Sequence, residues 1–210
     1  MVIMNKKAIA LGSSVLLSVS LLAAPALAHH PNGSEIPSNF TQGFLSGIGH
    51  PVIGIDHLVF VVAIGLLAAL SKKLGMVIPL AFIAATAIGT AIHLQSINLP
   101  LAELIISTSV LVMGIFLAQE KQANWLIITA IGAIAGIFHG YAYGESIVGA
   151  ETTALGAYLL GFCSIQLAIS AIAFYVGRTI VKTPTSIWLR FAGFATSGIG
   201  FAFVSNAILG

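Results

Sequence analysis

Residues 50–60 read HPVIGIDHLVF, and they begin an apolar run that continues to Leu70. Two histidines and an aspartate, His50, Asp56 and His57, therefore stand at the start of a segment suited to lipid. An aspartate near the centre of a bilayer costs about 2.5 to 3.5 kcal/mol on insertion scales, so such residues usually face a partner or a cavity. The stretch predicts a membrane helix with a polar site near one end.

The composition is that of an integral membrane protein. Hydrophobic residues make up 58% of the 210 residues and charged residues 7%, whereas soluble proteins have about 25% charged residues. The net charge of +2 comes from scattered Lys and Arg with no basic stripe, which excludes nucleic acid as a partner. A single cysteine, Cys163, excludes an intramolecular disulfide and a CxxC site, so any metal site must use nitrogen and oxygen.

Six segments are long and apolar enough to span a membrane, which needs about 20 residues to cross ~30 Å of hydrocarbon. Short polar turns separate them, and no second domain or inverted repeat is visible. We therefore expect an all-α, polytopic membrane helix bundle with six transmembrane helices. The segments are Ile53–Leu70, Met76–Leu94, Leu101–Ala118, Trp125–Tyr143, Thr152–Tyr175 and Ile187–Leu209.

Residues 1–28 have the pattern of a signal peptide. Two lysines precede an apolar stretch, and residues 26–28, Ala-Leu-Ala, supply the small-x-small pattern of a cleavage site. We expect a mature transmembrane domain of residues 29–210, which begins with a polar linker over residues 29–46. The alternative is an uncleaved first membrane helix, although Pro25 ends the apolar run short of a full span.

The basic residues predict the topology. If the cleaved N-terminus lies outside, every Lys and Arg of the mature chain falls on the cytoplasmic side, as the positive-inside rule requires. We expect a multi-pass protein of the bacterial inner (plasma) membrane with its N-terminus and C-terminus outside. All acids but Glu120, and the histidines of the spans, then lie in the outer half of the membrane or beyond it.

These outer polar residues are the candidate metal ligands. Pro51 fits the first turn of a helix, which places His50 near its N-terminal cap. In a straight helix His50 and His57 lie about 10 Å apart, too far to share an ion with metal–nitrogen bonds of about 2.0 to 2.1 Å. Either Gly54 lets the helix bend, or other helices complete the site. The residues available for completion are His93, Glu103, His139 and Glu145.

Each candidate also has a structural interpretation. A lone histidine such as His93 can be a satisfied core residue, and Glu103 and Glu145 can be solvated loop acids. For Asp56 with His57 beside it, the functional interpretation is favoured because an unpaired charge in lipid is costly. Separately, four glycines of the fourth span recur every four residues, which favours close helix packing. They are Gly132, Gly136, Gly140 and Gly144.

Two motifs resemble those of a known family. HPVIGIDH is similar to the HP-x-x-G-x-DH signature of the HupE/UreJ family, and FHGYAYGES resembles its second motif, FHG-x-AHG-x-E. By position, His50, Asp56 and His57 match the first motif, whereas His139 and Glu145 match the second. Tyr143 stands where the family usually has a second histidine, which bears on the ligand count and on metal preference.

The resemblance implies a nickel or cobalt permease, or an accessory protein of hydrogenases and ureases. Imidazole and carboxylate also suit Zn and Cu(II), whereas Cu(I) prefers clustered Cys and Met. We expect a transported metal ion as substrate, no permanent cofactor and no enzyme activity, and the resemblance implies metalloenzyme maturation proteins as partners. Two alternatives stay open: an accessory protein that binds metal without transport, and an intramembrane zinc hydrolase whose metal activates water.

Overall fold

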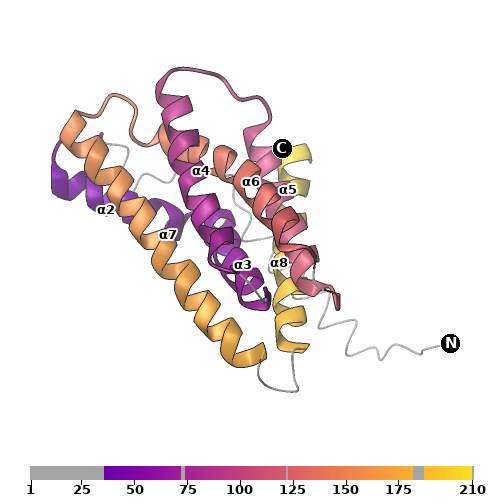
Figure 1. Ribbon diagram of the computed structural model, residues 1–210. Helices are drawn as coiled ribbons and strands as arrows, with labels where there is room; N and C mark the ends of the chain where they lie inside the picture. Colours follow the sequence, from indigo (N-terminus) through magenta and orange to yellow (C-terminus); the bar gives the residue numbers. More distant parts are fainter. Residues whose placement is uncertain (1–35, 72–73, 122, 182–186, 210) are drawn as a thin grey trace.

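The structure is a computed structural model that describes residues 36–71, 74–121, 123–181 and 187–209. Within these ranges it contains seven α-helices and no strand (Figure 1). The expected all-α class is therefore confirmed. The helices are α2 (Phe40–Ile53), α3 (Ile55–Leu70), α4 (Val77–Leu94), α5 (Ala102–Ala118), α6 (Trp125–Glu145), α7 (Thr152–Val181) and α8 (Ile187–Leu209).

Each of the six expected apolar segments corresponds to one of these helices, α3 to α8, although α6 and α7 continue beyond the expected ends to Glu145 and Val181. Four of them, α4, α6, α7 and α8, are long and apolar enough to cross a membrane. Helix α5 is shorter, with 17 residues, and α2 with α3 passes the same test as a pair bent by 79°. The protein is thus a multi-pass membrane protein, and the count of six spans stays a prediction. The expected signal peptide lies outside the described residues.

Helix α2 occupies part of the stretch that we expected to be a linker. The Asn39 side chain accepts a hydrogen bond from the backbone N–H of Gln42 and so caps the helix. A Cβ atom added at Gly43 or Gly47 would overlap carbonyl oxygens of α7, so α2 lies directly on α7 (Figure 1). The linker prediction is therefore wrong from Phe40 onward, because small residues give α2 a face that packs without large apolar side chains.

Pro51 lies in the last turn of α2 rather than in the first turn of the next helix. The predicted position of His50 near an N-terminal cap is therefore also wrong. Proline lacks the N–H that would bond the carbonyl one turn back, and its ring crowds that carbonyl. Because α2 ends soon afterwards, at Ile53, it loses little by this defect.

Helix α3 is the centre of the bundle and contacts every other described helix. Its side chains from Phe60 onward are almost all buried, in a core shared with α4, α5, α6, α7 and α8. A Cβ atom at Gly65 would lie 2.5 Å from the carbonyl oxygen of Ser170, so a bare backbone allows α7 to pack closely here. The helix that carries Asp56 and His57 is thus held on all sides.

The glycine ladder of α6 packs this helix closely against α4. A Cβ atom at Gly140 would overlap the backbone carbonyl oxygen of Thr86, and Thr90 Oγ1 donates a 2.8 Å hydrogen bond to the Gly140 carbonyl. At Gly132 the nearest atom is Met113 Cε on α5, 3.8 Å away. Close packing, the predicted role of the ladder, is confirmed for the remaining members: Gly136, Gly140 and Gly144.

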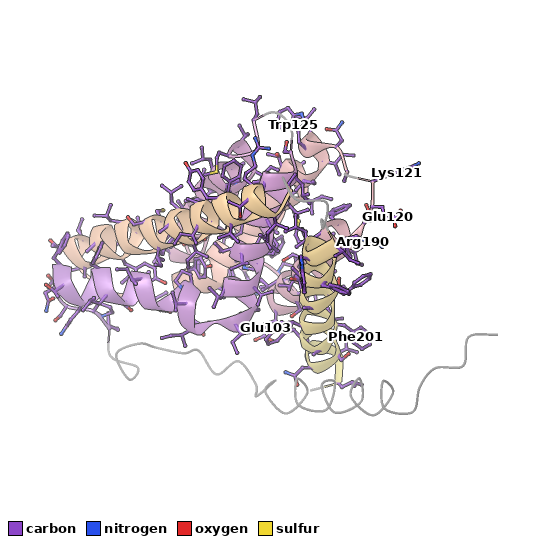
Figure 2. All side chains as sticks on the ribbon, turned by 90° about the horizontal axis from the view of Figure 1, so that it is seen from below. Glu103, Glu120, Lys121, Trp125, Arg190 and Phe201 are labelled. Carbon is purple, nitrogen blue, oxygen red and sulfur yellow. The ribbon has the colours of Figure 1, made fainter. Side chains whose placement is uncertain are left out.

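Helices α3 to α8 run in alternating directions, and the two ends of the bundle that they form differ chemically. The start of α3, the end of α4, the start of α5 and the end of α6 lie at one end, which carries the candidate ligands. The opposite end carries Arg178 and Arg190. In Figure 2, Glu120 and Lys121 lie near Arg190, apart from Glu103. Among the described residues, the histidines and the acids other than Glu120 thus lie away from the arginines in the fold.

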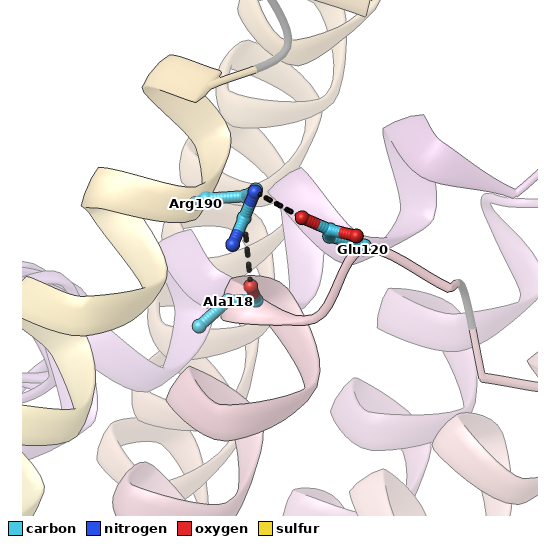
Figure 3. A network of polar contacts seen from close by, with 3 residues as sticks. All are labelled: Ala118, Glu120 and Arg190. Carbon is cyan, nitrogen blue, oxygen red and sulfur yellow. Dashed lines mark hydrogen bonds and ion pairs between the residues drawn. The ribbon is translucent and has the colours of Figure 1, made fainter.

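Both arginines at the basic end contact the C-termini of neighbouring helices. Arg190 Nε donates to the Ala118 carbonyl at the end of α5, over 3.2 Å, and its Nη1 pairs with Glu120 at 2.8 Å (Figure 3). Arg178 Nη1 donates to the Ala69 carbonyl near the end of α3, over 3.4 Å. The last carbonyls of a helix lack intrahelical partners, so cations placed there satisfy them and complement the helix dipole.

The glycine ladder generates a prediction with an internal control. Gly140→Ala should lower the stability of the bundle by about 1 to 3 kcal/mol, because its methyl group would meet backbone that cannot move independently. Gly132→Ala should be neutral or slightly stabilising, because its site is open and alanine favours helix. Thermal unfolding of both variants in detergent tests this, and equal midpoints would contradict the assigned packing.

Candidate metal centre

The candidate centre begins at the break between α2 and α3. The helix stops at Ile53 and restarts at Ile55, with a bend of 79° at Gly54. The bend brings the ring centroids of His50 and His57 to 5.7 Å, well short of the ~10 Å rise of a straight helix over seven residues. Of the two alternatives that the spacing leaves open, bending at Gly54 is therefore the one that the structure adopts.

Glycine is needed at this break for space rather than for backbone conformation. Gly54 has φ of −70°, which any residue can adopt. A Cβ atom there would lie 2.6 Å from Cδ2 of His57 and 3.2 Å from Oδ1 of Asp56. The bare backbone thus lets both side chains lie against the bend.

His57 is held by a hydrogen-bonded chain that crosses three helices. Its Nδ1 lies 2.7 Å from Nδ1 of His139 on α6. On the far side of that ring, Nε2 of His139 lies 3.0 Å from Oγ of Ser109 on α5. His139 is fully buried and packs against Phe60 and Phe82, with ring centroids 4.5 and 5.6 Å away. Both nitrogens of His139 are therefore engaged by protein groups.

His50 is anchored by a second set of hydroxyl groups. Its Nδ1 lies 2.7 Å from Oγ of Ser146, just past α6, and 3.3 Å from the hydroxyl of Tyr158 on α7. The Tyr158 hydroxyl donates its proton to the carbonyl of Tyr143, over 2.8 Å. Because that single proton is used, the Tyr158 oxygen is available to His50 only as an acceptor. Nδ1 of His50 is therefore the ring nitrogen that contacts protein hydroxyl groups.

Tyr143 contacts both candidate histidines. Its ring centroid is 5.0 Å from that of His50 and 4.7 Å from that of His57, both edge to face. The side chain is completely buried, and its hydroxyl has no hydrogen-bond partner. The position at which the resemblance expects a histidine is thus in contact with both histidines of the first motif.

Asp56 lies in the first turn of α3, partly exposed. Its Oδ1 accepts a 2.9 Å hydrogen bond from the backbone N–H of His57. A carboxylate at a helix N-terminus is stabilised by the helix dipole and by the N–H groups that lack intrahelical partners. The helix break therefore places the Asp56 carboxylate at a helix N-terminus, which stabilises its negative charge near lipid.

The other sequence candidates lie apart from this cluster. Glu103 is exposed at the start of α5, and Glu145 is exposed at the end of α6. His93 packs against Tyr141, with ring centroids 4.4 Å apart, and against Gly144; its Nδ1 is buried without a partner. Across the described parts of the chain, no three His, Cys, Asp or Glu side chains are close enough to hold one metal ion. The ligand set thus stays a prediction.

Sequence reasoning missed the groups that orient the histidines: Ser109, Ser146 and Tyr158. Hydroxyl residues are common in membrane helices, where they usually bond to their own backbone or to a neighbouring helix. No local pattern separates these from the rest. Only the tertiary contacts of His50 and His139 identify them.

Comparisons with known proteins agree with the motifs. The family model described as HupE / UreJ protein matches residues 17–203. Protein HupE of Rhizobium leguminosarum bv. viciae is 26% identical over 193 residues, which cover 91% of this chain and 97% of that protein. No solved structure matches.

The space at the helix break can be tested directly. Gly54→Ala should push the His57 ring and the Asp56 carboxylate away from the bend and weaken binding of Co²⁺ by about tenfold or more, as losses of ligand orientation do. Gly156→Ala is the matched control, because nothing lies within 4 Å of the added methyl group. Competition titration of purified protein measures both, and an unchanged affinity in Gly54→Ala would contradict the geometry.

Proposed function

Because this chain belongs to the HupE/UreJ family, we propose that it takes up a divalent transition metal, nickel or cobalt, across the bacterial cytoplasmic membrane for metalloenzyme maturation. The observation that carries the proposal is the helix break that brings His50 and His57 within 5.7 Å, with Asp56 at the new helix start. Imidazole nitrogen and carboxylate oxygen are suitable ligands for both metals.

The hydroxyl contacts of His50 support a ligand role. Its Nδ1 lies 2.7 Å from Ser146 Oγ and 3.3 Å from the Tyr158 hydroxyl, so protein groups orient the ring through this nitrogen. Metal-binding histidines commonly donate one ring N–H to a protein group and bind the metal through the other nitrogen. His50 can adopt this arrangement through Ser146 and Tyr158.

The discontinuous helix pair supports transport rather than storage. Many secondary transporters bind ions where a membrane helix is interrupted, because helix ends present partial charges that a continuous helix does not. The C-terminus of α2 carries a partial negative charge that attracts a cation, and Asp56 at the start of α3 adds a full one. The remaining acids that the structure describes at this end of the bundle, Glu103, Glu145 and Glu151, are exposed and raise the local concentration of cations.

The membrane potential is a sufficient driving force. Moving two positive charges inward across 100 mV releases about 4.6 kcal/mol, enough for roughly a thousandfold accumulation. The sequence has no GxxxxGK[ST] motif for ATP binding. Uptake driven by potential is therefore the mechanism that we propose.

Uptake into liposomes tests the function. Purified protein in liposomes with an imposed inside-negative potential should accumulate Ni²⁺ or Co²⁺ in a saturable manner, whereas protein-free liposomes should not. Metal bound at the membrane without accumulation would contradict transport and favour an accessory protein that captures metal. Lipid hydrolysis in the same liposomes would instead favour the zinc hydrolase.

Substitutions in the first motif should abolish uptake. Asp56→Asn removes the charge at nearly constant size, and His57→Ala removes a nitrogen ligand, so both should reduce uptake to the protein-free rate while the protein still inserts. Glu120→Gln, at the opposite end, is the matched control and should retain uptake. Wild-type rates in both motif variants would show that the cluster serves helix packing.

Tyr143→Phe should be milder, because the hydroxyl that it removes is buried without a partner. The ring that contacts both His50 and His57 would remain in place. Tyr143→His should change the relative rates of Ni²⁺ and Co²⁺ uptake, because it adds a nitrogen ligand beside the two histidines. Rates measured for both metals in the same liposomes test this, and an unchanged ratio would place position 143 outside the metal pathway.

Acidification should weaken metal binding. Metal binds neutral imidazole, whose unperturbed pKa is about 6.5, so protons compete with the metal. We expect the affinity for Co²⁺ to fall as the outside pH drops below about 6. An affinity that stays constant between about pH 7.5 and 5.5 would show that histidines are not the ligands.

A further inference from the structure

The chain of contacts behind His57 has a direction that begins at a backbone carbonyl. The Ser109 hydroxyl lies 2.6 Å from the carbonyl oxygen of Ile106, to which it donates. A carbonyl can only accept, and a hydroxyl has a single proton. The Ser109 oxygen must therefore accept the hydrogen bond at its other short contact, the 3.0 Å one from Nε2 of His139.

This assignment fixes both imidazoles in turn. A neutral His139 protonated on Nε2 has its lone pair on Nδ1, which then accepts in the 2.7 Å contact with Nδ1 of His57. Nδ1 of His57 must be the donor, and its lone pair lies on Nε2. The order of donors is thus His57, His139, Ser109 and the Ile106 carbonyl.

We propose that Ser109 and His139 are positioning residues that hold His57 in the tautomer with its lone pair on Nε2, the nitrogen that binds the transported metal. The part of this proposal that concerns metal binding rests on the proposed function. The part that concerns the tautomer of His57 does not. His139 then acts through His57 rather than as a ligand of its own, which differs from the role that the sequence predicted.

The environments of the two histidines support this division of roles. His139 is fully buried between Phe60 and Phe82, with both nitrogens engaged. His57 is 6% exposed and lies against Asp56 and the helix break. A ligand on His139 would have to replace one of two short hydrogen bonds, whereas a ligand on Nε2 of His57 would leave both intact.

Removing the Ser109 hydroxyl should allow both histidines to adopt the other tautomer. In Ser109→Ala, Nε2 of His139 loses its acceptor, so His139 can carry its proton on Nδ1 instead. Nδ1 of His139 then no longer accepts the hydrogen bond from Nδ1 of His57. A share of His57 then has its proton on Nε2, where it blocks the metal. Loss of groups that orient a metal ligand commonly costs about 10- to 100-fold in affinity, and we expect a loss of Co²⁺ affinity in that range.

The decisive measurement is the tautomer in the metal-free, full-length protein. Two-bond ¹H–¹⁵N correlations of histidine rings at pH 8 distinguish protonated from unprotonated nitrogens, and single-histidine substitutions assign the signals. We expect His57 with its proton on Nδ1 and His139 with its proton on Nε2 in the wild type, and mixed tautomers in Ser109→Ala. His139 with its proton on Nδ1 in the wild type would overturn the proposal.

Ser107→Ala is the matched control for affinity and for folding. Ser107 is buried to the same degree on the same helix, 6% exposed in each case. It should retain both the wild-type tautomers and the wild-type affinity for Co²⁺. An equal loss of affinity in Ser107→Ala and Ser109→Ala would show a general packing effect and overturn the positioning role.

The two proposals fail separately. If the wild type has the expected tautomers but neither binds nor transports Co²⁺ or Ni²⁺, the proposed function is wrong while the assignment of the hydrogen-bond chain holds. If the wild type transports metal but Ser109→Ala retains both the tautomers and the affinity, the positioning role is wrong and the proposed function stands.

Discussion

The break at Gly54 is the feature on which the rest of the site depends. A membrane helix is rarely interrupted, because backbone groups in lipid need internal partners. Here the interruption leaves few groups unsatisfied: Gly54 N–H donates to the His50 carbonyl, and the Gly54 carbonyl accepts from Leu58 N–H. The bend thereby brings His50 close to His57 and gives Asp56 a helix N-terminus.

Around this break, α6 links the two histidines. It carries His139, which contacts His57, and Tyr143, whose ring touches both His57 and His50. Ser146, just past the end of α6, bonds to His50. Glycines hold α6 against the backbone of α4, so a tightly packed helix pair positions the residues of α6 that contact the two histidines. The glycine ladder and the polar cluster are thus parts of one arrangement.

The sequence predicted helices α3 to α8 closely except at the end of α7, which continues from the expected Tyr175 to Val181. Long apolar runs between polar turns leave few alternatives in a membrane protein. Helix α2 was missed because it is 14 residues long and faces α7 with glycine and serine instead of a hydrophobic stripe. Pro51 was misplaced for a related reason: it fits the first turn of a helix well, and nothing in the sequence alone shows that a helix already precedes it.

For the site, the sequence predicted that His50, Asp56 and His57 belong together and left the bend at Gly54 as one of two alternatives. It did not predict that His139 uses both nitrogens within the protein, nor that Ser109 and Ser146 orient the rings. Such contacts join residues 30 to 96 positions apart, and only the packing of helices brings them together. Glu103 and Glu145 are exposed at the start of α5 and the end of α6, and their predicted role as ligands stays a prediction.

The central claim is that His50 and His57 hold the metal at the helix break. X-ray absorption spectroscopy of the protein loaded with one equivalent of Co²⁺ tests it most directly, because imidazole rings scatter in a recognisable pattern beyond the first shell. The account predicts a first shell of nitrogen and oxygen at about 2.0 to 2.2 Å with the scattering of two imidazoles. A sulfur ligand, which only Cys163 or a methionine could supply, or a spectrum without imidazole scattering, would contradict it.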